Sequence, residues 1–77
     1  MENIIEFMLK GSDPFFRITT NYQSKIGDVV FYELKADEKD YKDIVKLNNG
    51  NLELEGVISD KWVNLSENYI IWSVEIY

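Results

Sequence analysis

The sequence contains no cysteine and no histidine, and each absence excludes a class of chemistry. Without cysteine the chain has no disulfide framework and no thiolate that could bind a metal or attack a substrate. Without histidine it lacks the usual general base near neutral pH and the commonest metal ligand. Because a secreted domain of 77 residues would usually carry disulfides, we expect a cytoplasmic protein.

Long apolar runs and a basic N-terminal segment are also missing. The longest apolar stretch without a charge covers residues 69–74, whereas a membrane-spanning helix needs about 20 apolar residues. Residues 1–6 carry two glutamates and no basic residue, unlike the start of a secretory signal. We therefore expect neither secretion nor a membrane partner.

Basic residues are scarce: eight Lys and Arg stand against fourteen Asp and Glu, for a net charge of −6. Binding to nucleic-acid phosphates or to anionic lipids requires clustered positive charge, so we expect no direct contact with either. The acidity is concentrated in residues 28–60, where nine acids and four bases give a net charge of −5. Such a segment is either a solvated surface or a patch for a basic partner.

The remaining polar residues form no recognisable catalytic arrangement. Lys61 lies near Ser59 and imitates a Ser–Lys pair, but both are typical turn residues. The acidic stretch 37–43 lacks the alternating acids and central glycine of a calcium loop. A single small core leaves little room for a glycosidase cleft between paired carboxylates. We therefore predict that the protein is not an enzyme and uses no cofactor and no metal.

Short runs of branched and aromatic residues, separated by turn residues, predict an all-β and mainly antiparallel fold. Five to seven strands would form one small bent sheet, a barrel or a roll, as a single compact domain over residues 1–77. The clearest predicted strands cover residues 3–10, 15–20, 26–35 and 69–77. The first two are expected to pair as an antiparallel hairpin.

Residues 37–58 allow two interpretations. Asn49-Gly50 is a strong hairpin signal, because both positions of a type I′ turn need positive φ, and a turn there would pair Leu47 with Leu52. The alternative is at most one short helix near residues 37–46. Its cap would be Asp37, and its apolar side would consist of Tyr41, Ile44 and Val45. We favour the hairpin.

Two further features concern the bending of the sheet. Gly56 interrupts a strand and predicts a bulge or a sharp bend. The stretch Lys25–Val30, which reads KIGDVV and precedes a strand bent by glycine, resembles the opening of SH3-like barrels. This resemblance covers only these few residues and implies a fold, not a function.

Three predicted strands, at residues 3–10, 26–35 and 69–77, carry apolar side chains on both faces. A small sheet normally buries one face and exposes the other to water. The additional apolar face therefore requires a second layer, a partner or another copy of the chain. A tightly wrapped barrel that covers part of both faces is the structural alternative.

These features together predict a small acidic binding module without catalytic activity. We expect a protein–protein inhibitor or regulator of the phage, mobile-element or immunity type. Its protein partner would have a basic nucleic-acid-binding groove, which an acidic face imitating nucleic acid would fill. The residues predicted to bind the partner are Asp37, Glu38, Asp40, Tyr41, Asp43, Glu53, Glu55, Asp60, Trp62 and Tyr69.

The alternative is a structural or assembly protein that forms homo-oligomers through sheet edges or through a double-sided apolar sheet. Residues 69–77 are the expected edge strand, because they are long, apolar and almost uncharged.

Overall fold

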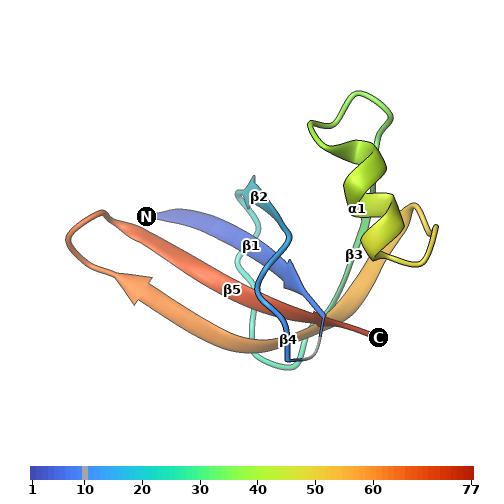
Figure 1. The fold of residues 1–77 in the computed structure, drawn as a ribbon. Helices are drawn as coiled ribbons and strands as arrows, with labels where there is room; N and C mark the ends of the chain where they lie inside the picture. Colours follow the sequence, from blue (N-terminus) through green and yellow to red (C-terminus); the bar gives the residue numbers. More distant parts are fainter. Residues whose placement is uncertain (10) are drawn as a thin grey trace.

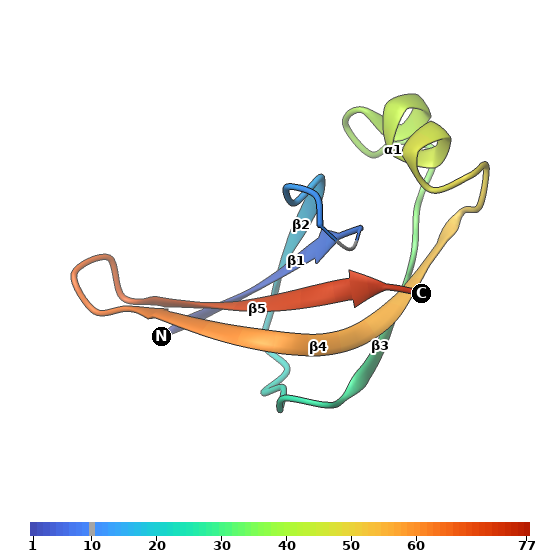
Figure 2. The same cartoon turned by 60° about the horizontal axis from the view of Figure 1, so that its bottom comes forward.

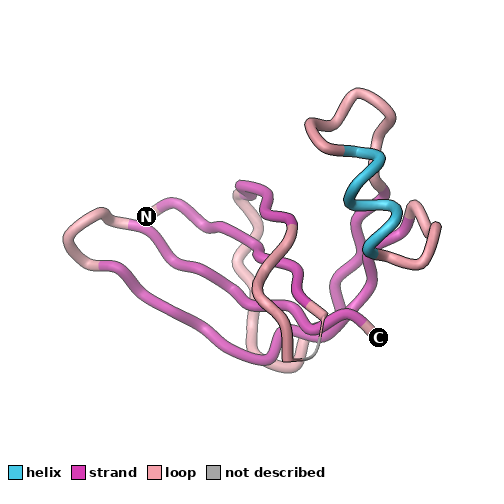
Figure 3. Tube along the Cα trace, viewed as in Figure 1, coloured by secondary structure: helices cyan, strands magenta, loops and turns pink. Residues whose placement is uncertain are grey.

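A computed structural model describes residues 1–9 and 11–77, and over these residues it contains five strands in one curled sheet and one short helix (Figure 1). The elements in chain order are β1 (Glu2–Met8), β2 (Phe16–Thr20), β3 (Val29–Glu33), α1 (Tyr41–Leu47), β4 (Glu53–Asn64) and β5 (Tyr69–Ile76). The predicted all-β class with at most one short helix is confirmed. The tube view shows how strands dominate the chain (Figure 3).

The strand order in the sheet is β2-β1-β5-β4-β3. β1 pairs with β2, β4 with β5, and β3 with β4 in antiparallel fashion, so the predicted mainly antiparallel sheet is confirmed. The parallel pairing of β1 with β5 was not predicted. The predicted edge strand at residues 69–77 is wrong, because β5 is the central strand and its two sides are both paired.

The predicted N-terminal strands are confirmed as an antiparallel hairpin, with somewhat shorter bounds. The first prediction covered residues 3–10, and its last residue, Lys10, lies outside the described residues. The third predicted strand, at residues 26–35, is shortened to β3 because a turn occupies residues 26–27.

The sheet curls toward the side on which α1 lies, so it has a concave inner face and a convex outer face (Figure 2). The inner face holds the core, and the helix contributes Ile44 to it. The buried core residues are Ile5, Phe7, Leu34, Ile44, Leu54, Ile58, Trp72 and Val74. The two outermost strands, β2 and β3, approach each other through side chains, since the ring centroids of Phe16 and Tyr32 are 5.4 Å apart.

The hairpin predicted around Asn49-Gly50 is wrong, and the helix is the correct alternative. Both residues do have positive φ, of 56° and 80°, but they end α1 instead of joining two strands. Leu47 and Leu52 do not pair and are 50% and 41% exposed. The helix wins because it buries Ile44 in the core, whereas the hairpin would have left its apolar pairs on a two-stranded ribbon.

The predicted apolar side of the helix is confirmed, since Tyr41 and Val45 pack against the core next to Ile44. The predicted cap at Asp37 is wrong. The helix begins after Asp40, whose φ is 60° and whose side chain makes no capping hydrogen bond.

The connection from α1 to β4 is held by the buried side chain of Asn48. Its Nδ2 donates hydrogen bonds to the carbonyl oxygens of Asn51, at 3.0 Å, and of Glu53, at 2.9 Å. Its backbone N–H closes the last helical turn on Ile44 and Val45. One side chain thus satisfies backbone acceptors where the chain passes from helix to strand.

β4 continues through Gly56 without a bulge, which was one of the two alternatives predicted for this residue. The glycine is buried, and a Cβ built on it would overlap the carbonyl group of Glu75 on β5. The irregularity lies three residues later, where the register of β4 against β5 shifts at Ser59. Gly56 is therefore needed for close approach of two backbones, which is the other common role of a strand glycine.

Candidate partner-binding face

The outer face of the sheet is the candidate site. Cross-strand register assigns its side chains, since residues opposite each other point to the same side. From β3, β4 and β5 this outer face comprises Val29, Phe31, Glu33, Glu53, Glu55, Val57, Asp60, Trp62, Asn64, Tyr69, Ile71, Ser73 and Glu75, with Tyr77 next to the end of β5. From β1 and β2 it comprises Glu2, Ile4, Glu6, Met8, Arg17 and Thr19.

The bulge at Ser59 decides which residues of β4 reach the outer face. Strict alternation starting from Glu53 and Glu55 would turn Asp60 and Trp62 toward the core. The extra residue at the bulge reverses the alternation, so Asp60 and Trp62 lie on the same face as the two glutamates. β4 thus presents one continuous row of side chains on the outer face, on both sides of the bulge.

Five carboxylates from three adjacent strands gather on the outer face. Four of them are exposed and the fifth, Glu75, is half-buried. Glu33 and Glu53 lie directly opposite each other on β3 and β4. Like charges in that position destabilise a sheet, so this pair does not contribute to the stability of the fold. The five are Glu33, Glu53, Glu55, Asp60 and Glu75.

Positive charge is scarce on this face. Among its described residues Arg17 is the one cation, and it forms an ion pair with Glu6 on the neighbouring strand. Lys61 points to the inner side, where its Nζ lies 5.0 Å from the ring centroid of Trp72. The carboxylates of β3 and β4 therefore keep their charge uncompensated by the strands around them.

Exposed aromatic rings lie among these carboxylates. Trp62 is 61% exposed, Phe31 is 56% exposed and Tyr77 is 74% exposed. Tyr69 is half-buried, and its hydroxyl accepts a hydrogen bond of 3.1 Å from Asn64. Rings beside carboxylates suit cationic groups, because the ring face and the carboxylate both attract positive charge. Tryptophan, tyrosine and arginine are also the residues that dominate binding energy in protein interfaces.

The other apolar residues of the outer face are partly covered. Ile4 lies between Thr19 and Ile71 in the register and is only 9% exposed, and Ile71 is half-buried. The predicted surplus of apolar surface is therefore smaller than the sequence suggested. It is concentrated at Trp62 near one end of β4 and at Val29 and Phe31 on β3.

The structure divides the ten predicted site residues into two groups. Glu53, Glu55, Asp60, Trp62 and Tyr69 lie on the outer face. Asp37, Glu38, Asp40, Tyr41 and Asp43 lie on α1 and the turns before it. This second segment is at one end of the molecule, opposite the turn that joins β4 to β5 (Figure 1).

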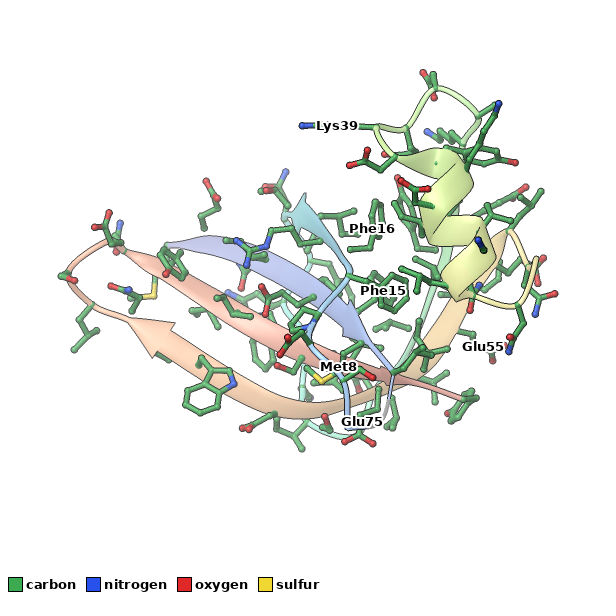
Figure 4. All side chains as sticks on the ribbon, in the orientation of Figure 1. Met8, Phe15, Phe16, Lys39, Glu55 and Glu75 are labelled. Atoms are coloured by element: carbon green, nitrogen blue, oxygen red, sulfur yellow. The ribbon has the colours of Figure 1, made fainter. Side chains whose placement is uncertain are left out.

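The segment around α1 is a weaker candidate than the outer face. Its acids alternate with lysines, one of which, Lys39, extends from the turn before α1 (Figure 4). Tyr41 is half-buried and packs against the core. Glu38 accepts a hydrogen bond from the hydroxyl of Tyr32. That hydrogen bond, with burial and the charges of Glu38 and Asp37, raises the pKa of Tyr32 to about 12.

Five residues of the outer face were not predicted as site residues: Val29, Phe31, Glu33, Glu75 and Tyr77. Their alternation along each strand was visible in the sequence. The neighbouring positions of β3, β4 and β5, and the bulge that aligns their faces, were not.

Other kinds of site find no support in the geometry. Among residues 1–9 and 11–77, no group of three or more acidic side chains is arranged to hold a metal ion. None of the helical structure described here is long and apolar enough to cross a membrane.

Comparisons of the chain with protein-family models, with curated proteins and with solved structures find no match.

Proposed function

We propose that the protein is a small acidic binding module, without catalytic activity, that docks its outer face onto a positively charged surface of another protein. The observation that carries the proposal is that β3, β4 and β5 bring five carboxylates and three exposed rings to the outer face, where the one cation among the described residues, Arg17, is already paired with Glu6. The Glu33–Glu53 pair costs stability unless a cation lies beside it.

The energetics of the exposed rings support the same proposal. A large apolar side chain left in water forgoes about 1.5–3 kcal/mol relative to full burial. A partner that covers Trp62 and Phe31 would recover part of this free energy. Its lysines and arginines would meet carboxylates on β3 and β4, which favours fast association that weakens with salt.

The partner class that fits best is a protein with a basic groove for nucleic acid, and the proposed role is inhibition or regulation of that protein. Glu53 and Glu55 lie on one face of β4. The rise per residue of an antiparallel strand separates two such alternate residues by about 6.8 Å along the strand. Asp60 extends this row beyond the bulge. We include a phage, mobile-element or immunity setting in the proposal because the chain is small and acidic.

A pull-down with charge-matched variants tests the proposal. The double variant Glu53→Gln/Glu55→Gln removes two charges from the outer face, and Asp40→Asn/Asp43→Asn removes two from the segment around α1. We expect wild-type beads and the second variant to retain the same cationic protein from host lysate, and the first variant to lose most of it. Equal retention by both variants, or no partner at low and moderate salt, would contradict the proposal.

Homo-oligomer formation is the second candidate function. Its predicted edge, residues 69–77, is central in the sheet, so β2 and β3 are the strands left with an unpaired side. A net charge of −6 and the carboxylates of the outer face oppose contact between copies. We expect light scattering to give a monomer at high micromolar concentration, and a dimer or larger species there would favour the oligomer instead.

A further inference from the structure

We propose that the partner contributes an extended segment, alternating apolar and basic residues, that pairs with the free side of β3. This inference rests on the proposed function and specifies how the partner binds. Addition of a strand to an exposed sheet edge is a recurring mode of peptide recognition. Three independent features of β3 and its surroundings lead to it.

The first feature is the direction of the backbone groups of β3. Ile58 N–H donates to Asp28 O at 2.8 Å and Leu34 N–H donates to Leu52 O at 2.8 Å. The backbone N–H and C=O groups of the even-numbered residues around β3 therefore point toward β4. In an antiparallel pair the backbone groups of the residues between them point to the other side of the strand. The N–H and C=O groups of Val29, Phe31 and Glu33 therefore face the free side of the strand. Among residues 1–9 and 11–77 they form a row of donors and acceptors without strand partners.

The second feature is a hollow between β3 and β2, the two outermost strands of the curled sheet, which do not pair with each other. It has a volume of about 230 Å³ and is lined mainly by apolar side chains, with Phe31 at the β3 edge. Its lining includes Ile5, Phe7, Ile18, Val30 and Ser24. Ser24 is buried, and its hydroxyl oxygen has no hydrogen-bond partner among the described residues. An inward side chain of an added strand would fill this hollow and complete the inner face.

The third feature is charge. An added strand would lie about 4.8 Å from β3 and about 9.6 Å from β4, the usual strand spacing. Its outward side chains would then lie beside Glu33 and within reach of Glu53 and Glu55. Lysine or arginine at alternate positions matches these carboxylates, and apolar residues between them match the hollow.

The occupant is therefore a different protein and not a second copy of this chain. No two basic residues of the sequence are two positions apart, so no segment offers the required alternation. A second β3 would also place Glu33 against the acidic row of the first copy.

A capped peptide, acetyl-Lys-Val-Lys-Val-Lys-Val-amide, provides the probe, and its control is the same peptide with every backbone amide N-methylated. The control retains charge and apolar side chains but cannot donate a backbone hydrogen bond along either edge. We expect the first peptide, in an NMR titration, to protect the amides of Val29, Phe31 and Glu33 from hydrogen exchange. We expect the methylated peptide to bind at least tenfold more weakly. Equal binding of both peptides, or no binding of the first, would overturn the proposal.

Phe31→Pro removes an N–H that does not bond to β4, and proline is tolerated at such edge positions. Phe31→Ala is its matched control, because both variants lose the ring. We expect the proline variant to bind the peptide at least tenfold more weakly than the alanine variant, with both folded by circular dichroism. Equal affinities would overturn strand addition.

The pull-down separates this inference from the proposed function. A partner that is lost by Glu53→Gln/Glu55→Gln but retained equally by Phe31→Pro and Phe31→Ala would keep the outer face as the binding site. The same result would contradict the proposal that the partner adds a strand to β3. A partner lost by neither set of variants would remove both proposals.

Discussion

At Gly56 the backbones of β4 and β5 approach more closely than a side chain allows. A Cβ at this position would lie 2.7 Å from the carbonyl carbon of Glu75 and 2.8 Å from Cγ1 of Val74, and would overlap the Glu75 oxygen. We expect Gly56→Ala to lower the free energy of unfolding by about 3 kcal/mol or more, as overpacking against backbone does. Urea denaturation measures the loss.

Gly11→Ala is the control for this prediction. Gly11 has a φ of 77° and open space around it, so only backbone strain opposes a Cβ there. We expect this variant to lose about 1 kcal/mol. A Gly56→Ala protein as stable as Gly11→Ala would contradict this role of Gly56, because the two strands would then separate locally for no more than the cost of backbone strain.

The hydroxyl of Tyr32 has a pH dependence that reports its hydrogen bond to Glu38. The pKa of Tyr32 is raised from 10.0 to about 12, first by this hydrogen bond and then by burial and nearby charge. The folded state therefore holds the proton more tightly than the unfolded state. The resulting stability is present below pH 10 and is lost as the pH rises toward 12.

We expect Tyr32→Phe to be less stable than wild type at neutral pH, and the difference to shrink as the pH rises from about 10 to about 12. Urea denaturation of both proteins at several alkaline pH values gives the difference directly, and other titrating groups cancel between them. A difference that stays constant over this range would contradict the assigned hydrogen bond.

Among the elements, the helix-to-strand connection depends on Asn48. Removing its side chain leaves the carbonyl groups of Asn51 and Glu53 without a donor. We expect Asn48→Ala to cost about 2 kcal/mol of stability, in the range for buried groups that lose their partner. The exposed neighbour Asn51 is the control, and Asn51→Ala should change stability by about 0.5 kcal/mol or less. Similar losses in both variants would contradict this role of Asn48.

The same connection shows where sequence reasoning reached its limit. The positive φ of Asn49 and Gly50 was predictable from their residue types, and so was the apolar side of the helix. The choice between hairpin and helix was not predictable, because it depends on the burial of Ile44 against strands that are distant in sequence. Local preferences describe the turn equally well in both cases.

The strands show the same limit at the candidate site. Alternation predicted which residues of β3 share a face, and Glu53 and Glu55 were correctly placed together on β4. The shift at Ser59 carries no residue signature, since the glycine that suggested a bulge lies three positions earlier. The assembly of the outer face depends on that shift and on the central position of β5, neither of which is local.

For the whole molecule, the two tryptophans distinguish the core from the outer face. Trp72 is 5% exposed and Trp62 is 61% exposed. We expect Trp72→Ala to cost about 3–5 kcal/mol, as for other buried aromatic residues. We expect Trp62→Ala to cost far less in stability but to abolish retention of the partner. A large stability loss from Trp62→Ala, measured by thermal unfolding, would assign this ring to the fold and not to binding.

The most direct test of the outer face is the ¹H–¹⁵N spectrum of the intact protein with the captured partner, read at the two indole N–H signals. The indole of Trp72 donates a 3.1 Å hydrogen bond to Oδ1 of Asn3 on the inner side and serves as an internal reference. We predict that the partner shifts the Trp62 signal and leaves the Trp72 signal in place. A bound complex in which Trp62 keeps its free chemical shift would contradict docking through the outer face.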